Sequence, residues 1–242
     1  MDHILITAAE QEELICAQQA FKAYEAKLGA RNISVDFMLT GIGTTSTCYR
    51  LTKKIMEAAN TKKPYSLVIN IGIAGSYAFR DSDNSPAPFP MGSVAIIEKE
   101  YFGDLGFETI FGFQTLFQYD ILDADVFPFK GGALHRKPLN SQMEEFLGQY
   151  NKAIGVTVQT VTGNPERTVE LRKQFSPHIE SMEGAAVYYV CLLEDIPCFE
   201  LRTVSNEVGE RDRNKWNTPL ALESLKSAMT GFFGSICNDA AE

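Results

Sequence analysis

Two stretches decide the fold and chemistry of this chain: Ser-Met-Glu-Gly-Ala-Ala at residues 181–186 and Leu-Arg-Thr-Val-Ser-Asn at residues 201–206. The first opens a helix of small apolar residues and places Glu183 at its start, where the helix dipole favours a carboxylate. The second is an apolar strand that ends in polar side chains, among them Asn206. Ligands of α/β proteins bind at the carboxyl ends of the strands. A carboxylate that accepts hydrogen bonds from a vicinal diol, beside an amide that reads a purine edge, indicates a nucleoside site.

The size and charge of the chain limit the classes of protein to which it can belong. Its 242 residues are 45% hydrophobic and 22% charged, which predicts one globular domain over residues 1–242. The net charge of −9 argues against a nucleic-acid surface, because such a surface needs clustered lysines and arginines. No apolar run is long enough to span a membrane, and no signal peptide is visible. We therefore expect neither a nucleic-acid nor a membrane partner.

The cysteines and histidines predict neither a disulfide framework nor a metal site. The five cysteines are scattered and form no Cys-x-x-Cys pair, which indicates free thiols in the reducing cytoplasm. The three histidines lie far apart and match no ligand spacing. We expect no metal and no cofactor.

Short apolar runs alternate with segments of helical periodicity along the chain, which predicts the α/β class. The predicted strands lie at residues 4–7, 33–39, 65–71, 91–98, 153–161 and 197–205. Helices are predicted from about residue 10, from the turn at residues 40–46 to about residue 60, and at 140–149, 165–175, 183–193 and 218–235. The segment 107–138 is rich in phenylalanine and has no clear periodicity. We interpret it as an irregular excursion that forms an oligomer contact or a lid over a pocket.

Several motifs resemble those of the purine nucleoside phosphorylase superfamily over nearly the whole chain. They are Met-Glu-Gly-Ala-Ala at residues 182–186 and Arg-x-x-Ser-Asn at residues 202–206. The closer resemblance is to the hydrolase members, the methylthioadenosine nucleosidases and the futalosine hydrolases. The resemblance implies a single-domain, three-layer α/β/α fold with a central mixed twisted sheet. It also implies a small-molecule nucleoside substrate and a homo-oligomer.

The turn after the third predicted strand favours water over phosphate as the nucleophile. Phosphorylases of the superfamily carry an Arg and a Ser for phosphate where this chain has Asn70 and Ile73. A dianion needs charged or hydrogen-bonding partners, and Ile offers none. The resemblance to the nucleosidases assigns Glu12 to hold and deprotonate the attacking water. For Glu10 and Glu13 we expect only the general preference for acids in a first helical turn.

The resemblance assigns roles to the residues of the two deciding stretches. Glu183, with Met182 beside it, is expected to bind the ribose hydroxyls. Asn206 is expected to hold the departing base, with Ser205 orienting it, and Arg202 to fix Glu12 or the water. An amide has no usable proton to act as a general acid. In the superfamily an Asn at this position goes with 6-oxopurines, which makes a hypoxanthine nucleoside the expected substrate.

Further residues are expected near the base and in the loops of the site. Phe102 either stacks on the base or the sugar or belongs to the core. Glu166 and Arg167 follow a turn that lines the base pocket in the nucleosidases, although a solvent ion pair at a helix start is an equal alternative. The expected site loops contain Gly43 of a Gly-x-Gly turn and the residues Ile73, Ala74 and Gly75.

Two stretches resemble the futalosine hydrolases in particular: Phe-Gly-Asp-Leu-Gly at 102–106 and Glu-Arg-Asp-Arg-x-x-Trp at 210–216, where Trp216 is expected to anchor the loop. This resemblance implies an N-ribosyl hydrolase that releases hypoxanthine and dehypoxanthinyl futalosine during menaquinone biosynthesis. The carboxyphenyl ketone of futalosine then lies in the Phe-rich segment, and an Arg pairs with its carboxylate.

Three other readings stay open at this point. The first is a methylthioadenosine/adenosylhomocysteine or aminofutalosine nucleosidase, against which Asn206 and Ser181 count. The second is a phosphorylase, which Asn70 and Ile73 disfavour. The third is a non-catalytic nucleoside-binding sensor, which has no need of a water-holding carboxylate.

Overall fold

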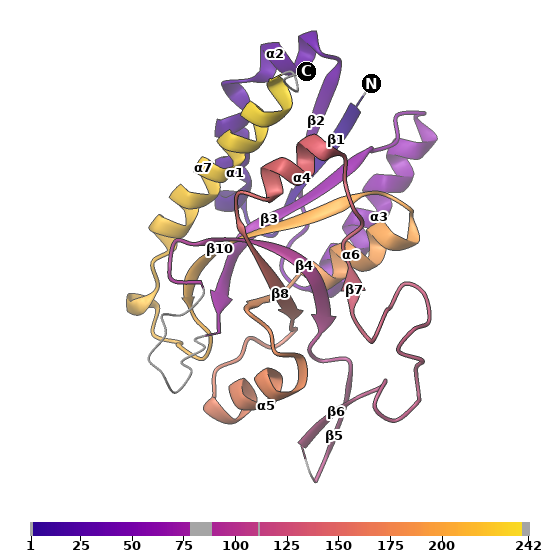
Figure 1. Cartoon of the computed structure of the whole chain (residues 1–242), viewed down its shortest axis with the longest axis vertical. Coiled ribbons are helices and arrows are strands. Elements are labelled where there is room, and N and C mark those ends of the chain that lie inside the picture. The colour runs from indigo at the N-terminus through magenta and orange to yellow at the C-terminus, as the bar shows by residue number, and fades with distance from the viewer. Residues whose placement is uncertain (1, 78–88, 111, 239–242) are drawn as a thin grey trace.

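A mixed β-sheet runs through the centre of the molecule (Figure 1) in the computed structural model, which describes residues 2–77, 89–110 and 112–238. Its main strands are β1 (Asp2–Ala8), β2 (Ile33–Leu39), β3 (Leu67–Ser76), β4 (Val94–Phe102), β8 (Asn151–Thr157), β9 (Ile179–Ser181) and β10 (Cys198–Glu207). β1 lies parallel to both β2 and β3, and β3 lies parallel to β10. β4 is antiparallel to β10 and parallel to β8. The predicted mixed sheet is therefore confirmed.

Part of this sheet closes on itself. The short strand β9 pairs in parallel with β8 and antiparallel with the end of β3. β3, β10, β4, β8 and β9 consequently form a ring of paired strands at the carboxyl end of β3. The sequence does not predict this ring, because β9 has only three residues and shows no periodicity of its own.

Helices cover both faces of the sheet, as the three-layer prediction requires (Figure 1). One face carries α1 (Gln11–Lys22), α2 (Glu25–Ala30), α4 (Ser141–Leu147) and α7 (Thr218–Cys237). The other carries α3 (Thr44–Asn60) and α6 (Gly184–Leu193), while α5 (Pro165–Phe175) lies near the ends of β8 and β9. α2 and β9 are the elements of the main body that the sequence does not predict.

The alternation of side chains along β1 builds the two cores. Ile4 and Ile6 face α1 and α7, whereas Leu5 faces α3 and α6. Successive side chains of a strand point to opposite faces of the sheet, so a strand that is apolar throughout is covered on both sides. The largest core cluster includes Phe232, whose ring contacts those of Phe146 and Phe199.

The Phe-rich segment is irregular, as predicted. It contains the hairpin of β5 (Gly106–Thr109) and β6 (Gly112–Thr115), and the two-residue strand β7 (Leu134–His135) that pairs with β4. Phe111 and the proline-rich residues 80–88 lie outside the described part of the chain. None of the described helices combines the length and apolar character needed to cross a membrane.

Candidate active site

A cavity of about 480 Å³ opens at the carboxyl ends of β1, β3 and β10. The start of α1, the end of β3, the turn between β9 and α6 and the end of β10 all contribute to its lining. The predicted loop residues Ile73, Ala74 and Gly75 lie in its wall, together with Met182. This is the edge of an α/β sheet at which ligands bind.

Glu183 is held at the start of α6 by a backbone amide at the start of the neighbouring helix α3. It is the N-terminal capping residue of α6, it is 4% exposed, and its Oε1 accepts a hydrogen bond of 3.0 Å from the Gly43 amide. Gly43 has a φ of +88°, which favours glycine at this turn. Gly43 thus contributes to the site by fixing Glu183. An ionised carboxylate keeps acceptor positions free for the hydroxyls of a ligand.

The structure turns Glu13 into the site, where the sequence analysis expected Glu12. Glu12 is exposed at the mouth of the cavity. Glu13 is 6% exposed, and its carboxylate accepts hydrogen bonds from the amides of Ile73 (2.9 Å) and Glu10 (3.0 Å). The bond to Glu10 places Glu13 at the third helical position, reaching back to the capping residue. The Glu-x-x-Glu spacing at the start of α1 was the available signal for this role.

Arg202 lies between the carboxylates of the site. It is 1% exposed, its Nε bonds Glu200, and its Nη2 lies 3.6 Å from Glu183 Oε2. A Cβ atom on Gly72 would meet both Arg202 and Glu13, so the two side chains share the space that this glycine leaves open. Burial raises the pKa of Glu13 above its ordinary 4.5, and the charge of Arg202 and the two amide bonds oppose that rise. A buried carboxyl with a raised pKa suits a general base.

Asn206 and Ser205 lie at the end of β10, where they face the cavity. The Ser205 hydroxyl donates to Asn206 Oδ1 at 2.8 Å, and Asn206 Nδ2 donates to the Glu207 carbonyl at 2.9 Å. The register of β10 against β3 shifts between Val204 and Asn206, and such a bulge re-aims the side chains that follow. Because an amide carries two N–H donors, Asn206 keeps one for a ligand.

Three residues expected at the base do not line this cavity. The ring of Phe102 packs against those of Phe129 and Tyr189, so Phe102 belongs to the core, which was the alternative. Arg167 bonds Asp104 and Glu170 and stacks on the Phe113 ring. Glu166 is exposed beside it, in a neighbouring cavity of about 700 Å³. The ion-pair interpretation of Arg167 therefore holds, since its charge is already matched by two carboxylates.

The cavity wall also contains residues that the sequence analysis missed. Glu180 of β9 accepts hydrogen bonds from the Thr162 amide, the Thr162 hydroxyl and the Tyr77 hydroxyl. It ties the turn after β8 to the ring of strands. Because β9 has only three residues, no periodic pattern in the sequence indicated that Glu180 would face the site.

The mouth of the cavity is formed by the loop after β10. Arg211, Arg213 and Trp216 line it. The Trp216 indole donates to the Glu210 carbonyl at 3.0 Å, which confirms that it anchors this loop. The Arg211 guanidinium lies 5.3 Å from the centroid of the Trp216 ring. No ion pair with a described carboxylate engages either arginine.

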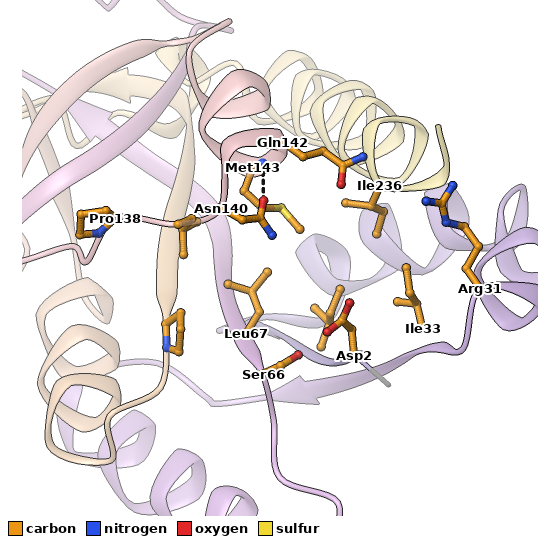
Figure 2. Close-up of a pocket in the computed structure, with 13 residues that line it drawn as sticks. Asp2, Arg31, Ile33, Ser66, Leu67, Pro138, Asn140, Gln142, Met143 and Ile236 are labelled. Carbon is orange, nitrogen blue, oxygen red and sulfur yellow. Dashed lines mark hydrogen bonds between the residues drawn. The ribbon is translucent and has the colours of Figure 1, made fainter. Parts of the chain in front are cut away.

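A further cavity, of about 360 Å³, lies near the start of β1 and β3 (Figure 2). Two of its polar side chains already have partners: Asn140 caps α4 by accepting from the Met143 amide, and Arg31 donates to the Cys237 carbonyl. Within the described ranges, no group of three or more His, Cys, Asp or Glu is placed to hold a metal ion. The carboxyl-edge cavity is therefore the candidate active site.

Comparison with known proteins gives the same family and fold. The family model of the Phosphorylase superfamily matches residues 7–233. The futalosine hydrolase of Streptomyces coelicolor is 28% identical over 235 residues, which cover 94% of this chain and 93% of that protein. The futalosine hydrolase of Thermus thermophilus is 28% identical over 210 residues, with 86% and 84% covered.

Solved structures of nucleosidases share the fold. The native futalosine hydrolase of Helicobacter pylori strain 26695 matches with a TM-score of 0.72 at 17% identity over 97% of each chain. The 5′-methylthioadenosine/S-adenosyl homocysteine nucleosidase of Campylobacter jejuni matches with a TM-score of 0.70 at 17% identity, covering 98% of this chain and 99% of that one. The predicted nucleoside phosphorylase-like fold is thereby confirmed.

Proposed function

This chain belongs to the phosphorylase superfamily, and we propose that within it the chain is a nucleoside hydrolase that cleaves the glycosidic bond of futalosine. The products are hypoxanthine and dehypoxanthinyl futalosine, which places the reaction in menaquinone biosynthesis. The observation that carries the proposal is the juxtaposition of Glu13, Glu183 and Asn206 in one cavity, with the buried Arg202 beside both carboxylates. The names of the 28% identical relatives support the choice of substrate.

Water is the nucleophile in this proposal. The Ile73 amide, a natural donor to an anion, is occupied by the Glu13 carboxylate. A second anion beside Glu13 and Glu183 would be repelled, because Arg202 is already shared among carboxylates. Glu13 takes a proton from the water molecule while the water oxygen forms a bond to C1′ of the ribose. Glu183 binds the ribose hydroxyls and stabilises the cationic character of the sugar.

Asn206 stabilises the departing base. As the C1′–N bond breaks, its electron pair leaves with the purine. The free N–H of Asn206 donates to this growing negative charge, and the bond from Ser205 fixes the orientation of the amide. Hypoxanthine leaves more readily than adenine, so a hydrogen bond suffices where an adenine nucleosidase needs an acid. Asn206 therefore favours futalosine over methylthioadenosine and aminofutalosine as the substrate.

The product assay that tests this function uses futalosine, aminofutalosine, methylthioadenosine and inosine, each with and without phosphate. We expect hypoxanthine release from futalosine at a rate that phosphate does not change. Release that requires phosphate would make the protein a phosphorylase, and preferential adenine release would make it an adenine nucleosidase. Tight binding of futalosine without turnover would favour a sensor.

Substitution of Glu13 tests the assignment of the base. Glu13→Gln keeps the shape of the side chain but cannot take a proton, so we expect kcat/KM to fall by about 10²–10⁴. Glu12→Gln is the matched control, because Glu12 is exposed at the same helix start, and its kcat/KM should stay within about threefold of wild type.

The pH profile belongs to the same test. The base must be ionised, so activity is lost as the pH falls through the pKa of Glu13. Because burial raises that pKa, the acidic limb of kcat/KM should lie above the ordinary carboxyl value of 4.5. Equal losses of kcat/KM in Glu13→Gln and Glu12→Gln would contradict the assignment of Glu13 as the general base.

We further propose that Arg211 and Arg213 recognise the carboxylate of the futalosine substituent. They lie at the cavity mouth in a chain with a net charge of −9, where two unmatched cations stand out. Arg211 is held against Trp216, which fixes its guanidinium plane near the opening. A substrate that ends in a carboxylate then gains charge-assisted hydrogen bonds that an uncharged nucleoside lacks.

The double variant Arg211→Ala/Arg213→Ala separates this role from the chemistry. We expect its KM for futalosine to rise about tenfold, the loss of one charge-assisted bond, with kcat/KM for inosine unchanged. Lys215→Ala is the control, because it removes a cation of the same loop that pairs with Glu210. A similar rise in KM for inosine would indicate damage to the loop instead.

We also propose that the chain forms a homo-oligomer through α3 and works in the cytoplasm. Tyr49 and Met56 are 69% and 49% exposed, and their seven-residue spacing places them along one face of α3; Ile42, which is 55% exposed, lies just before this helix. Ile42 also lines the active-site cavity, so a partner on this face would adjoin the site. The buried thiols of Cys191 and Cys198 contact each other without a disulfide, in keeping with a reducing compartment.

Charged substitutions on this face test the oligomer. Tyr49→Glu/Met56→Glu should convert the oligomer to a monomer in size-exclusion chromatography with light scattering. Val169→Glu, at a site 62% exposed on α5, should leave the mass unchanged. A wild-type chain that elutes as a monomer would refute the proposal.

A further inference from the structure

Two buried carboxyl groups lie behind Arg202, outside the lining of the cavity. Glu100 of β4 and Glu200 of β10 are both 0% exposed. Glu200 Oε1 accepts from Arg202 Nε at 2.5 Å. The mechanism above uses neither of them. Ionised carboxylates are rarely buried without compensation, because removing a charge from water costs several kcal/mol.

One oxygen of each group faces the other. Glu100 Oε1 and Glu200 Oε2 are buried, and among the described residues no N–H or hydroxyl group donates a hydrogen bond to either atom. Both lie beside Gly184: a Cβ atom there would be 2.5 Å from Glu100 Oε1 and 2.2 Å from Glu200 Oε2. Two bare carboxylate oxygens in such proximity repel each other. A single proton between them satisfies both atoms.

The surrounding hydrogen bonds decide which group carries this proton. The Thr157 hydroxyl accepts from the Ala185 amide at 2.8 Å, so its own hydrogen points to Glu100 Oε2 at 2.9 Å. Burial raises the pKa of Glu200 as well, but the charge and hydrogen bond of Arg202 and the hydrogen bond with Glu100 oppose that rise and favour its ionised form. Burial, and then the charge of Glu200, hold the pKa of Glu100 well above its ordinary value. Glu100 is therefore the acid and Glu200 its ionised acceptor.

We propose that Glu100 and Glu200 form a proton-sharing pair that positions Arg202 against Glu13 and Glu183. The pair thereby sets how strongly the charge of Arg202 weakens Glu13 as a base. Glu100 and Glu200 are positioning residues, and the catalytic part of this inference rests on the proposed function. The proton on Glu100 lets Glu200 hold Arg202 without adding a second negative charge. Glu200 in turn neutralises part of the Arg202 charge that would otherwise weaken Glu13 as a base.

Other titratable groups also face the pair. Burial keeps the hydroxyl of Tyr188 of α6 neutral by raising its pKa, and this hydroxyl donates to the Ile97 carbonyl. The charge of Glu183 acts on Glu200 as well as on Arg202. Glu13 itself faces Arg202, Glu183 and the amides of Ile73 and Glu10. Changes at position 200 therefore reach Glu13 through Arg202.

Two amide substitutions give opposite results if the pair works in this way. In Glu100→Gln the amide oxygen accepts from Thr157 and the amide N–H donates to Glu200, which imitates the protonated acid. We expect kcat/KM on futalosine within about threefold of wild type and an unchanged acidic limb. Glu200→Gln replaces the charged partner of Arg202 by a neutral amide, and any charge on Glu100 is farther away. We expect the acidic limb to move down by about 1 pH unit and the plateau to fall severalfold.

A purely structural role predicts a different pattern. Both variants would then lose thermal stability and activity together, with no shift of the pH profile, and this result would overturn the inference. Glu200→Asp, which keeps the charge, should leave the acidic limb closer to that of wild type than Glu200→Gln does. A shift of equal size in both amide variants would also count against the pair.

Infrared spectroscopy tests the shared proton without any assay of activity. A protonated carboxyl has a carbonyl band distinct from those of carboxylates. We expect the wild-type spectrum at pH 8 to contain such a band, Glu100→Gln to lack it, and Glu12→Gln to retain it. Failure to hydrolyse futalosine would refute the proposed function and leave this result intact. Absence of the band in a protein that hydrolyses futalosine would refute the pair alone.

Discussion

The buried guanidinium of Arg202 is the charge on which the site depends. It is 1% exposed and serves Glu200, Glu183 and Glu13, which come from β10, the start of α6 and α1. Each of these carboxylates would be costly at its depth without a cation nearby. The guanidinium therefore joins three elements that are distant in sequence. Because its plane is rigid and its donors are fixed, it also sets where the carboxylates lie.

The ring of strands explains how one arginine reaches so many partners. β10 pairs with both β3 and β4, so a side chain on its inner face lies near the middle of the ring. Glu200 and Arg202 are two residues apart and share that face. The bulge before Asn206 then directs the next polar group towards the cavity. One strand thus supplies the buried cation, its partner and the amide that faces the cavity.

Much of this could be predicted from the sequence, because local signals mark it. Helix and strand periodicity locates the main elements, and Glu183 and Asn206 lie where a helix begins and a strand ends. The resemblance favoured Glu12, although the Glu-x-x-Glu spacing at the start of α1 is the pattern of a capping box that includes Glu13. The position of Phe102 depends on its contact with Tyr189, and that of Arg167 on its ion pair with Asp104. Such partners are set by tertiary packing, which one sequence does not reveal.

Gly184 leaves the space that the acid pair requires. Its missing side chain is the space that Glu100 and Glu200 occupy, so the three positions cannot change independently. An alanine at this position would require at least one of the two acids to move or to be replaced, because its Cβ would lie 2.5 Å from Glu100 Oε1 and 2.2 Å from Glu200 Oε2. Gly184 therefore limits which residues can occupy positions 100 and 200, although it contributes no functional group of its own.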